Sequence, residues 1–164
     1  MALFSPDLYY TSVHAIDLEE LKGRGVDALL VDLDNTLLPR DTNVVTREHH
    51  EWAREVAAAG FSVCLVSNNW HERVLGVAEE LGFQLVPKAV KPMPFAFLKG
   101  LRLLGSERSK AATIGDQMFT DVLGGNLLGM TTILVTALST SDLPHTLLLR
   151  RFESMVLAGR EPLP

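Results

Sequence analysis

The chain has 164 residues, 47% of them hydrophobic, with 15 basic and 20 acidic side chains. This length and composition predict one self-supporting domain over residues 1–164 and exclude a disordered chain. The net charge of −5 argues against general nucleic-acid binding. Cys64 is the single cysteine, which excludes a disulfide framework. Because the sequence shows no secretory signal and no stretch of roughly 20 apolar residues, we expect a cytoplasmic location.

The charges are unevenly distributed along the chain. Residues 1–84 contain 6 Lys and Arg against 14 Asp and Glu, whereas residues 85–110 contain 6 against a single acidic residue, Glu107. A solvated helix face would explain the basic segment. The segment would equally serve as the basic side of an otherwise acidic site, which suits an anionic substrate.

Short apolar runs alternate with helix-like segments along the whole chain. Asp17 and Thr46 are suited to cap helices, Pro94 fits the first turn of another, and glycines follow several helix ends. In chain order, the pattern predicts a helix over 17–22, a strand over 26–32, a helix over 46–59, a strand over 61–67, a helix over 70–81, a strand over 84–86, a helix over 94–104, a strand over 111–116, a helix over 119–128, a strand over 131–136 and a helix over 145–158.

The predicted strands are nearly continuous apolar runs joined by helical crossovers, which indicates a parallel sheet covered on both faces. The expected fold class is therefore α/β, with a single doubly wound, Rossmann-like parallel sheet of about five strands. Its core spans about residues 26–136. A preamble over residues 1–25 precedes this core, and a helix over about 145–158 follows it.

Polar and acidic residues stand where three of the predicted strands end. They are Asp32, Asp34, Ser67, Asn68, Asp116 and, five residues further on, Asp121. In an open parallel sheet, ligands bind beyond the carboxyl ends of the strands, where the strand order reverses. If the first and fourth strands are neighbours there, the four aspartates converge and cannot all stay ionised without a cation. Carboxylate oxygens suit Mg²⁺, so we expect all four to form a magnesium site.

The spacing also suggests roles in phosphoryl chemistry. Asp32 and Asp34 lie on the same side of the strand end, so one can attack a phosphorus atom while the other handles protons. Ser67 and the amides around Asn68 can hold phosphate oxygens at the start of the next helix. A lysine from the basic segment and Mg²⁺ would complete the neutralisation. Two simpler interpretations stay open: Ser67 as a helix cap, and Asp121 as an acid of the first helical turn.

Together these residues resemble the motifs of the haloacid dehalogenase (HAD) phosphatase superfamily. DLDNT, which begins at Asp32, is similar to its D-x-D-x-[TV] motif, and SNN, which begins at Ser67, to its strand-terminal Ser or Thr. Lys91, followed by proline, is similar to its lysine motif, and GDQMFTD to its acidic motif. The resemblance implies an HAD-like fold, an aspartyl-phosphate on Asp32, Mg²⁺ as cofactor, and Thr36 among the phosphate-binding residues.

Longer stretches are similar to the class IIIA, YqeG-type branch of this superfamily, among them VSNN, KAVKP, GDQMFTDVLGGN and the preamble SPDLYYTSVHAIDLEELKGRGV. The branch includes phosphatidylglycerophosphate phosphatases. It therefore implies a Mg²⁺-dependent phosphomonoester hydrolase, with phosphatidylglycerophosphate or another large or lipid phosphate as candidate substrate. Lys91 takes the catalytic lysine position because it precedes proline as in the family motif, and Lys88 is the alternative.

Many members carry a cap domain inserted after the first or second motif. Here the intervening segments, Leu38–Gly60 and Trp70–Val90, leave no room for one, so we expect an open site with the loop over Leu38–Val45 as its flap. An open site suits a phosphate on a large molecule or a lipid surface, or closure by a second copy in a homo-oligomer.

Other functions remain possible from the sequence. The chain would also fit an HAD phosphatase of small soluble esters, or a catalytically silent interaction module. A signalling receiver is disfavoured, because its phosphorylated aspartate follows the third strand, and here the third strand ends at Lys88 without an acid.

The C-terminal helix has an apolar stripe and two adjacent basic residues. They are Leu148, Phe152, Met155 and Val156, with Arg150 and Arg151. This stripe either packs on the sheet as an ordinary terminal helix or docks the open site on anionic lipid, which would make the protein peripheral to a membrane.

Overall fold

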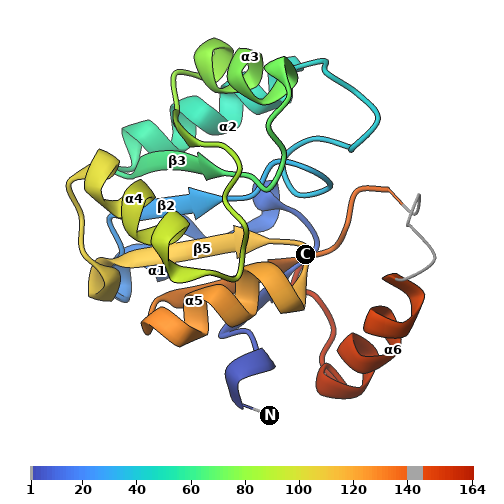
Figure 1. Ribbon diagram of the computed structural model, residues 1–164. Coiled ribbons are helices and arrows are strands. Elements are labelled where there is room, and N and C mark those ends of the chain that lie inside the picture. Colours follow the sequence, from blue (N-terminus) through green and yellow to red (C-terminus); the bar gives the residue numbers. More distant parts are fainter. Residues whose placement is uncertain (1, 140–145) are drawn as a thin grey trace.

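The computed structural model describes residues 2–139 and 146–164 (Figure 1). Its centre is a six-stranded parallel sheet with the order β1-β6-β5-β2-β3-β4. The strands are β1 (Leu8–Tyr10), β2 (Ala28–Val31), β3 (Ser62–Val66), β4 (Gln84–Val86), β5 (Ala111–Gly115) and β6 (Thr131–Val135). The predicted α/β class is confirmed, and all five predicted strands are present.

Helices connect successive strands and cover the sheet, and a further helix follows the last strand. They are α1 (Leu18–Gly23), α2 (Arg47–Ala58), α3 (Glu72–Leu81), α4 (Pro94–Leu104), α5 (Leu123–Leu128) and α6 (Thr146–Val156), with 3₁₀ turns η1 (Ala2–Phe4), η2 (Val13–Ala15) and η3 (Arg108–Lys110) and a π-helical turn η4 (Met118–Val122). The predicted caps form, since the Asp17 carboxylate accepts from two amides of α1 and Thr46 opens α2. The helix predicted over 119–128 is divided into η4 and α5.

Alternate side chains of the central strands enter two separate apolar layers, as a doubly wound sheet requires. Leu29 and Val31 of β2 belong to a cluster with Trp52 of α2. Leu30, between them, belongs to a second cluster with Phe97 of α4. Accordingly α2 and α3 lie on one face of the sheet, and α4 and α5 lie on the other (Figure 1).

The sixth strand, β1, corrects the expectation of about five. It lies within the predicted preamble and pairs with β6 at the edge of the sheet. The Asp7 carboxylate accepts from the Thr132 amide at 2.8 Å, and the Thr11 amide donates to the Leu163 carbonyl at 2.9 Å. A run of three residues is too short for its periodicity to indicate a strand. Only its pairing with distant parts of the chain defines it.

The C-terminal helix packs on the fold. The Phe152 ring lies 5.4 Å from that of Phe4 and 5.2 Å from that of Phe119, between centroids. Val156 packs on the same cluster, whereas Met155 is 69% exposed. This contact favours the terminal-helix interpretation over lipid docking.

The side chains of Leu148 and Arg150, which the sequence also placed on the C-terminal helix, lie outside the described residues. In the part of the chain that the structure describes, the helices are too short or too polar to cross a bilayer.

No cap domain interrupts the sheet. Residues 32–46 connect β2 to α2, and residues 67–71 connect β3 to α3, each without an inserted domain. In the described part of the chain, no cap domain therefore covers the carboxyl ends of the strands.

Candidate functional site

The strand order reverses between β2 and β5, the two neighbours at the centre of the sheet. From β2 the chain continues to β3 and β4 on one side and returns to β5 and β6 on the other. Val31 lies opposite Ile114, and the Asp32 amide donates to the Ile114 carbonyl at 2.9 Å. Asp32 and Asp116 therefore leave the sheet side by side at the reversal, as the sequence predicted.

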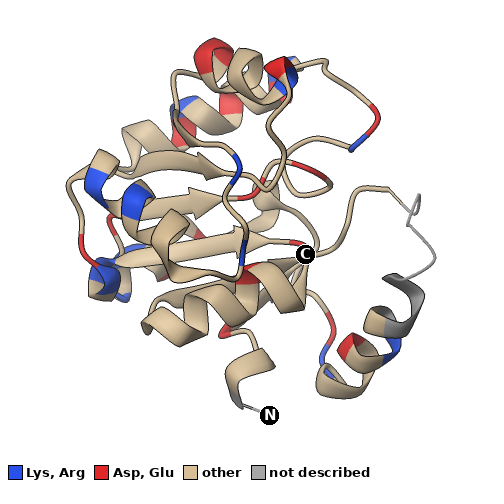
Figure 2. Ribbon diagram, viewed as in Figure 1, with Lys and Arg blue, Asp and Glu red and all other residues tan. Residues whose placement is uncertain are grey.

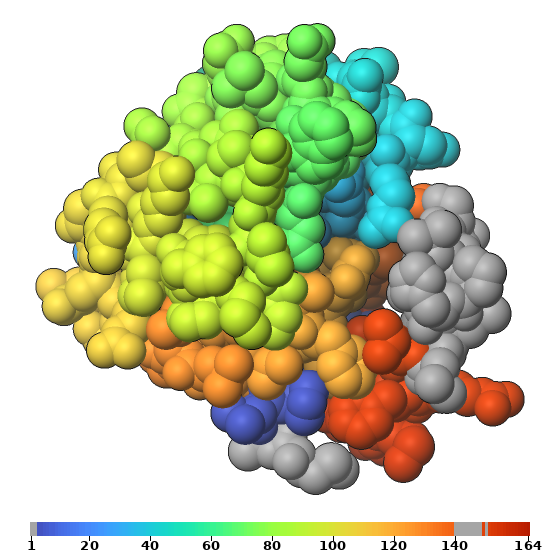
Figure 3. Space-filling view, in the orientation of Figure 1, coloured from blue at the N-terminus to red at the C-terminus, as the bar shows by residue number. Residues whose placement is uncertain are grey.

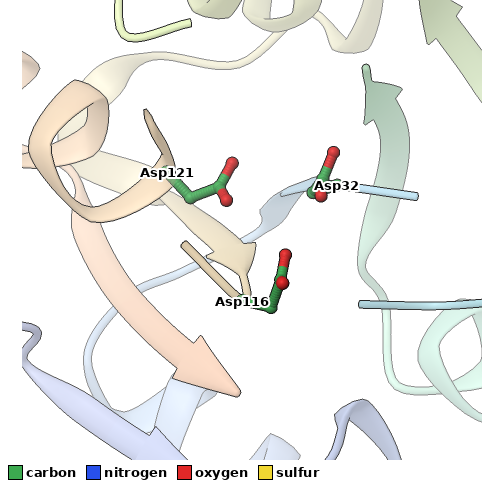
Figure 4. Close-up of side chains that lie close together, drawn as sticks. All are labelled: Asp32, Asp116 and Asp121. Carbon is green, nitrogen blue, oxygen red and sulfur yellow. The ribbon is translucent and has the colours of Figure 1, made fainter. Parts of the chain in front are cut away.

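Three carboxylates converge beyond these strand ends. Oxygens of Asp32, Asp116 and Asp121 lie within 4.8 Å of one another and face a common space (Figure 4). Asp121 belongs to η4, and π-helical turns recur at functional sites. A Cβ at Gly115 would lie 2.1 Å from Cγ of Asp121, so glycine is required there for the third carboxylate to approach.

Lys91 is the cation that joins this carboxylate cluster. Its Nζ donates to Oδ1 of Asp32 and to Oδ1 of Asp121, both at 2.7 Å, and the side chain is buried. Lys88 instead lies exposed, with its Nζ 5.2 Å from the centroid of the Trp70 ring. The geometry thus brings Lys91, and not Lys88, to the aspartates.

The segment that carries Lys91 has an unusual backbone. Lys88 and Val90 have positive φ angles, 53° and 54°, a conformation that costs roughly 1–2 kcal/mol for a residue other than glycine. Hydrogen bonds to the end of β3 hold it. The Ala89 amide donates to the Ser67 carbonyl at 2.9 Å, and the Lys91 amide to Oδ1 of Asn68 at 2.8 Å. The SNN motif thereby positions the lysine.

The basic segment over residues 85–110 combines the two interpretations considered from the sequence, a solvated face and a basic side to the acidic site. Figure 2 shows its cations along the connection after β4 and on α4, while acidic residues gather on α2 and α3. Lys91 enters the carboxylate cluster, whereas Lys110 forms an exposed ion pair with Glu107 at 3.4 Å. Most of the segment is therefore solvated, and one lysine serves the site.

The cluster is short of positive charge. Burial, reinforced by neighbouring carboxylates, raises the pKa of Asp32 to about 6 and that of Asp116 to about 8. Burial alone would lower the pKa of Lys91, but the Asp121 and Asp32 carboxylates outweigh it and raise that pKa. One ammonium thus faces three carboxylates, and protons compensate for the missing charge.

A divalent cation fits this donor set. Oxygen ligands of high negative charge are those that Mg²⁺ prefers, and Asp32, Asp116 and Asp121 supply them. Thr36 Oγ1 lies within hydrogen-bond distance of two of them, 3.2 Å from Oδ1 of Asp116 and 3.4 Å from Oδ2 of Asp32, and can donate its proton to either. The structure thus places Thr36 beside the carboxylates.

Asp34, the fourth predicted ligand, lies outside this cluster. Its carboxylate forms an ion pair with Arg73 and accepts from Nδ2 of Asn69 at 3.4 Å. The side chain of Asp34 is therefore not grouped with the three carboxylates of Asp32, Asp116 and Asp121.

Arg73 was not singled out from the sequence, yet it contacts three parts of the site. Besides Asp34, its guanidinium donates to the carbonyls of Pro39 at 2.9 Å and Thr42 at 2.8 Å. The sequence did contain an indication of a special role. Arg73 lies in the first turn of α3, where the helix dipole disfavours a cation.

The simpler interpretations of Ser67 and Asp121 can now be compared with the geometry. Ser67 is buried, its Oγ accepts from the Asn69 amide at 3.1 Å, and the N-cap of α3 is His71. Asp121 is also buried and pairs with Lys91. Ser67 is therefore not the N-cap of α3, whereas Asp121 does lie in the first turn of η4 and in addition contacts Lys91.

A small pocket opens over the carboxylates. Its volume is about 60 Å³, and Figure 3 shows the surrounding segments bordering a recess on this face. It is lined by Asp32, Asp34, Arg40, Asn68, Lys91, Gln117 and Thr120. A larger pocket of about 360 Å³ lies at the opposite ends of the strands, with uncharged lining residues. The charged lining and the convergence of three carboxylates, rather than the volume, identify the small pocket as the site.

The chain is similar to known proteins. Residues 89–145 match the HAD-hydrolase-like family. The chain is 39% identical to the probable phosphatase YqeG of Bacillus subtilis (strain 168) over 156 residues, 95% of this chain and 91% of that protein. It is 26% identical to phosphatidylglycerophosphate phosphatase 1, chloroplastic/mitochondrial, of Arabidopsis thaliana over 162 residues, 93% of this chain and 47% of that protein.

A solved HAD superfamily (subfamily III A) hydrolase from Legionella pneumophila matches with a TM-score of 0.52 and 18% identity, over 80% of this chain and 73% of that one. At that identity the match supports the fold alone. The fold and site define an α/β hydrolase of the HAD type. With 39% identity to YqeG over most of both sequences, the chain belongs to the HAD-like hydrolases.

Proposed function

We propose that the chain is a Mg²⁺-dependent phosphomonoester hydrolase that forms an aspartyl-phosphate on Asp32. The observation that carries this proposal is the buried group of Asp32, Asp116, Asp121 and Lys91 at the strand-order reversal. When bound, Mg²⁺ would neutralise charge on the nucleophile and on the phosphoryl oxygens. The relationship to YqeG supports the same activity.

In the first step, a carboxylate oxygen of Asp32 attacks the phosphorus atom, and the bond from phosphorus to the ester oxygen breaks. The leaving oxygen takes a proton from the Asp34 carboxyl group, which lies at the pocket rim. Lys91 stays beside Asp32 and stabilises the negative charge of the transferring group. Ser67 and Asn68 lie at the end of β3, where their polar groups can hold phosphoryl oxygens.

In the second step, a water molecule attacks the phosphorus atom of the aspartyl-phosphate. Its proton passes to the Asp34 carboxylate, the bond between phosphorus and the Asp32 oxygen breaks, and inorganic phosphate leaves. The hydrogen bond from Arg73 orients the Asp34 side chain, as a carboxyl group in the first transfer and as a carboxylate in the second. Two carboxylates of one strand end thereby divide the nucleophilic and proton-transfer roles.

The preferred substrate in this proposal is a phosphate on a large or lipid molecule, phosphatidylglycerophosphate among them. A pocket of about 60 Å³ admits little beyond the phosphoryl group, because pockets that enclose ligands usually have roughly 300–1,000 Å³. Exposed apolar side chains that lie within a few residues of Asn68 or Lys91 in the sequence suit a lipid surface and a peripheral membrane location. They are Trp70, Val90, Met93 and Phe95. The similarity to the Arabidopsis enzyme supports the same substrate.

A phosphate-release screen tests the proposal. Purified protein with Mg²⁺ is offered phosphatidylglycerophosphate in detergent, soluble sugar and nucleoside phosphates, and p-nitrophenyl phosphate. We expect release that depends on Mg²⁺ and is fastest with the lipid. Release from small esters alone would replace the lipid proposal by a soluble-ester phosphatase. No release from any ester would favour a silent interaction module.

A further inference from the structure

The loop after β2 carries a β-turn that faces the pocket. The Thr42 amide donates to the Pro39 carbonyl at 3.3 Å, which places Arg40 and Asp41 at the tip of the turn. Of these two, Arg40 lines the pocket above Asp32. The side chain of Arg40 is exposed, so its guanidinium is in contact with solvent at the mouth.

Two other residues hold this turn in place. Arg73 donates to the carbonyls at both ends of the turn, Pro39 and Thr42, at 2.9 and 2.8 Å. Oδ1 of Asn35 accepts from the Arg40 amide at 3.0 Å, and the φ angle of Asn35 is 61°, a left-handed conformation that asparagine tolerates well. The backbone of Arg40 is thus fixed before any ligand binds, which reduces the entropy lost on binding.

The cations around the pocket differ in how they are neutralised. Lys91 is paired with Asp32 and Asp121, and Arg73 is paired with Asp34. Arg40 makes no ion pair with any of the residues that the structure describes. Its charge is therefore available to a ligand at the mouth.

We propose that Arg40 forms a binding subsite for a second anionic group, carried by the leaving group of the substrate. The inference rests on the proposed hydrolase function and narrows its substrates to phosphomonoesters with a carboxylate, phosphodiester or second phosphate near the scissile ester. Since the pocket accommodates little beyond the phosphoryl group, the leaving group stays at the mouth beside Arg40. A guanidinium binds such oxyanions through paired hydrogen bonds.

Matched substrates test the subsite. Propyl phosphate has no second anion, 3-phosphooxypropionate adds a carboxylate, and the deacylated headgroup of phosphatidylglycerophosphate adds a phosphodiester. We expect Arg40→Gln to lower kcat/KM by about 10- to 100-fold for the two substrates that carry a second anionic group, the scale of one charge-assisted hydrogen bond. Propyl phosphate hydrolysis should change little. Arg54→Gln, an exposed arginine of α2, is the matched control.

The lipid itself, dispersed in detergent, forms the last arm of the series. An equal loss with the lipid and with its deacylated headgroup shows that Arg40 binds the headgroup anion. A loss confined to the lipid would overturn the subsite, because Arg40 would then contact the surface instead. An equal loss with propyl phosphate would overturn it as well, since the residue would then act on the reaction itself.

Binding measured without turnover separates this inference from the proposed function. In calorimetric titrations with Mg²⁺, propane-1,3-bisphosphonate should bind the wild-type chain more tightly than propylphosphonate does. Arg40→Gln should remove that difference, and Arg40→Lys should retain part of it. If no ester is hydrolysed but the difference is present, the hydrolase proposal fails and the subsite stands. If the two phosphonates bind equally, the subsite is wrong whatever the chain hydrolyses.

Discussion

Asp32 and Asp34 follow β2 two residues apart, yet they belong to two groups of charged residues in contrasting environments. The inner group, Asp32 with Asp116, Asp121 and Lys91, is buried and has three carboxylates for one ammonium. The outer pair, Asp34 with Arg73, lies at the pocket rim and is balanced one to one. The inner group is therefore short of positive charge and fits an added cation, whereas the charges of the outer pair cancel.

This contrast shows how one strand end can supply two chemical roles. Asp32 and Asp34 are separated by a single leucine, yet their neighbours come from different elements. Lys91 and Asp121 follow β4 and β5, whereas Arg73 belongs to α3. In the proposed mechanism, the environment rather than the residue type divides the nucleophile from the proton carrier. Substitutions that disturb one group at a time can separate these roles.

Replacing the nucleophile should have the largest effect. Asp32→Asn keeps the shape of the side chain but removes the attacking carboxylate, so kcat for ester hydrolysis should fall by about 10⁴-fold or more. Phosphate release is measured with saturating Mg²⁺. The control is Asp27→Asn, at the other end of the same strand, which should leave kcat unchanged. A near-normal rate for Asp32→Asn would contradict the covalent mechanism.

Removing the inner ammonium should be the next most costly change. Lys91→Ala should lower kcat by about 10²–10⁴-fold, the scale of losing one electrostatic stabiliser in a buried site. It should also lower the melting temperature, because two buried carboxylates lose their partner. Lys88→Ala, which affects only the exposed contact with Trp70, is the matched control and should cost far less. The reverse ranking would transfer the catalytic role to Lys88.

Disturbing the outer pair should have a smaller effect than either inner change. Arg73→Ala releases both the Asp34 carboxylate and the turn over Pro39–Thr42, and misplacement of such groups should lower kcat by about 10- to 100-fold. Arg73→Lys keeps the charge but loses the forked geometry, so it should recover part of the rate. Equal activity of Arg73→Ala and wild type would show that Asp34 needs no positioning partner.

Removing one metal-type carboxylate should sharpen the distinction between chemistry and metal binding. Asp116→Asn should weaken Mg²⁺ binding by at least about 10-fold, since it removes one charge from the donor set. Raising Mg²⁺ should therefore restore part of the activity, unlike in Asp32→Asn. The Mg²⁺-dependent rise in melting temperature reports the affinity directly. A variant with full Mg²⁺ affinity would exclude Asp116 as a ligand.

The remaining prediction concerns the stability of the metal-free protein, rather than its rate, as a function of pH. Aspartates of the unfolded chain lose their protons near about pH 4, whereas native Asp116 keeps its proton to about pH 8 and Asp32 to about pH 6. Between these values the native state binds more protons, so stability should fall as pH rises from about 4 to about 8. Calorimetry in a chelator should show the fall, and Mg²⁺ should flatten it. A melting temperature that rises through this window without metal would contradict the assignment.

Much of the fold and of the inner group could be predicted because the signals are local. Apolar runs, helix caps and glycines lie within a few residues of the elements that they determine, and the aspartates stand directly at the predicted strand ends. The proline after Lys91 likewise favoured that lysine over Lys88, and the geometry agrees. Parallel sheet topology then brings the strand ends together.

The rest depended on contacts between parts of the chain that are distant in sequence. Strand β1 has only three residues and is defined by its pairing with β6 and by a hydrogen bond to Leu163. The position of α6 depends on the contacts of Phe152 with Phe4 and Phe119.

The sequence by itself determined which residues carry negative charge to the sheet edge, because strand ends and their side chains are set by local periodicity. Only the tertiary structure decided that Asp34 pairs with Arg73 and leaves the metal-type cluster. It also decided that Arg40 stands at the mouth without an ion pair among the described residues, on a turn held by Arg73. Ion pairs form between residues brought together by folding, and their choice of partner follows from distance and burial, which no local pattern encodes.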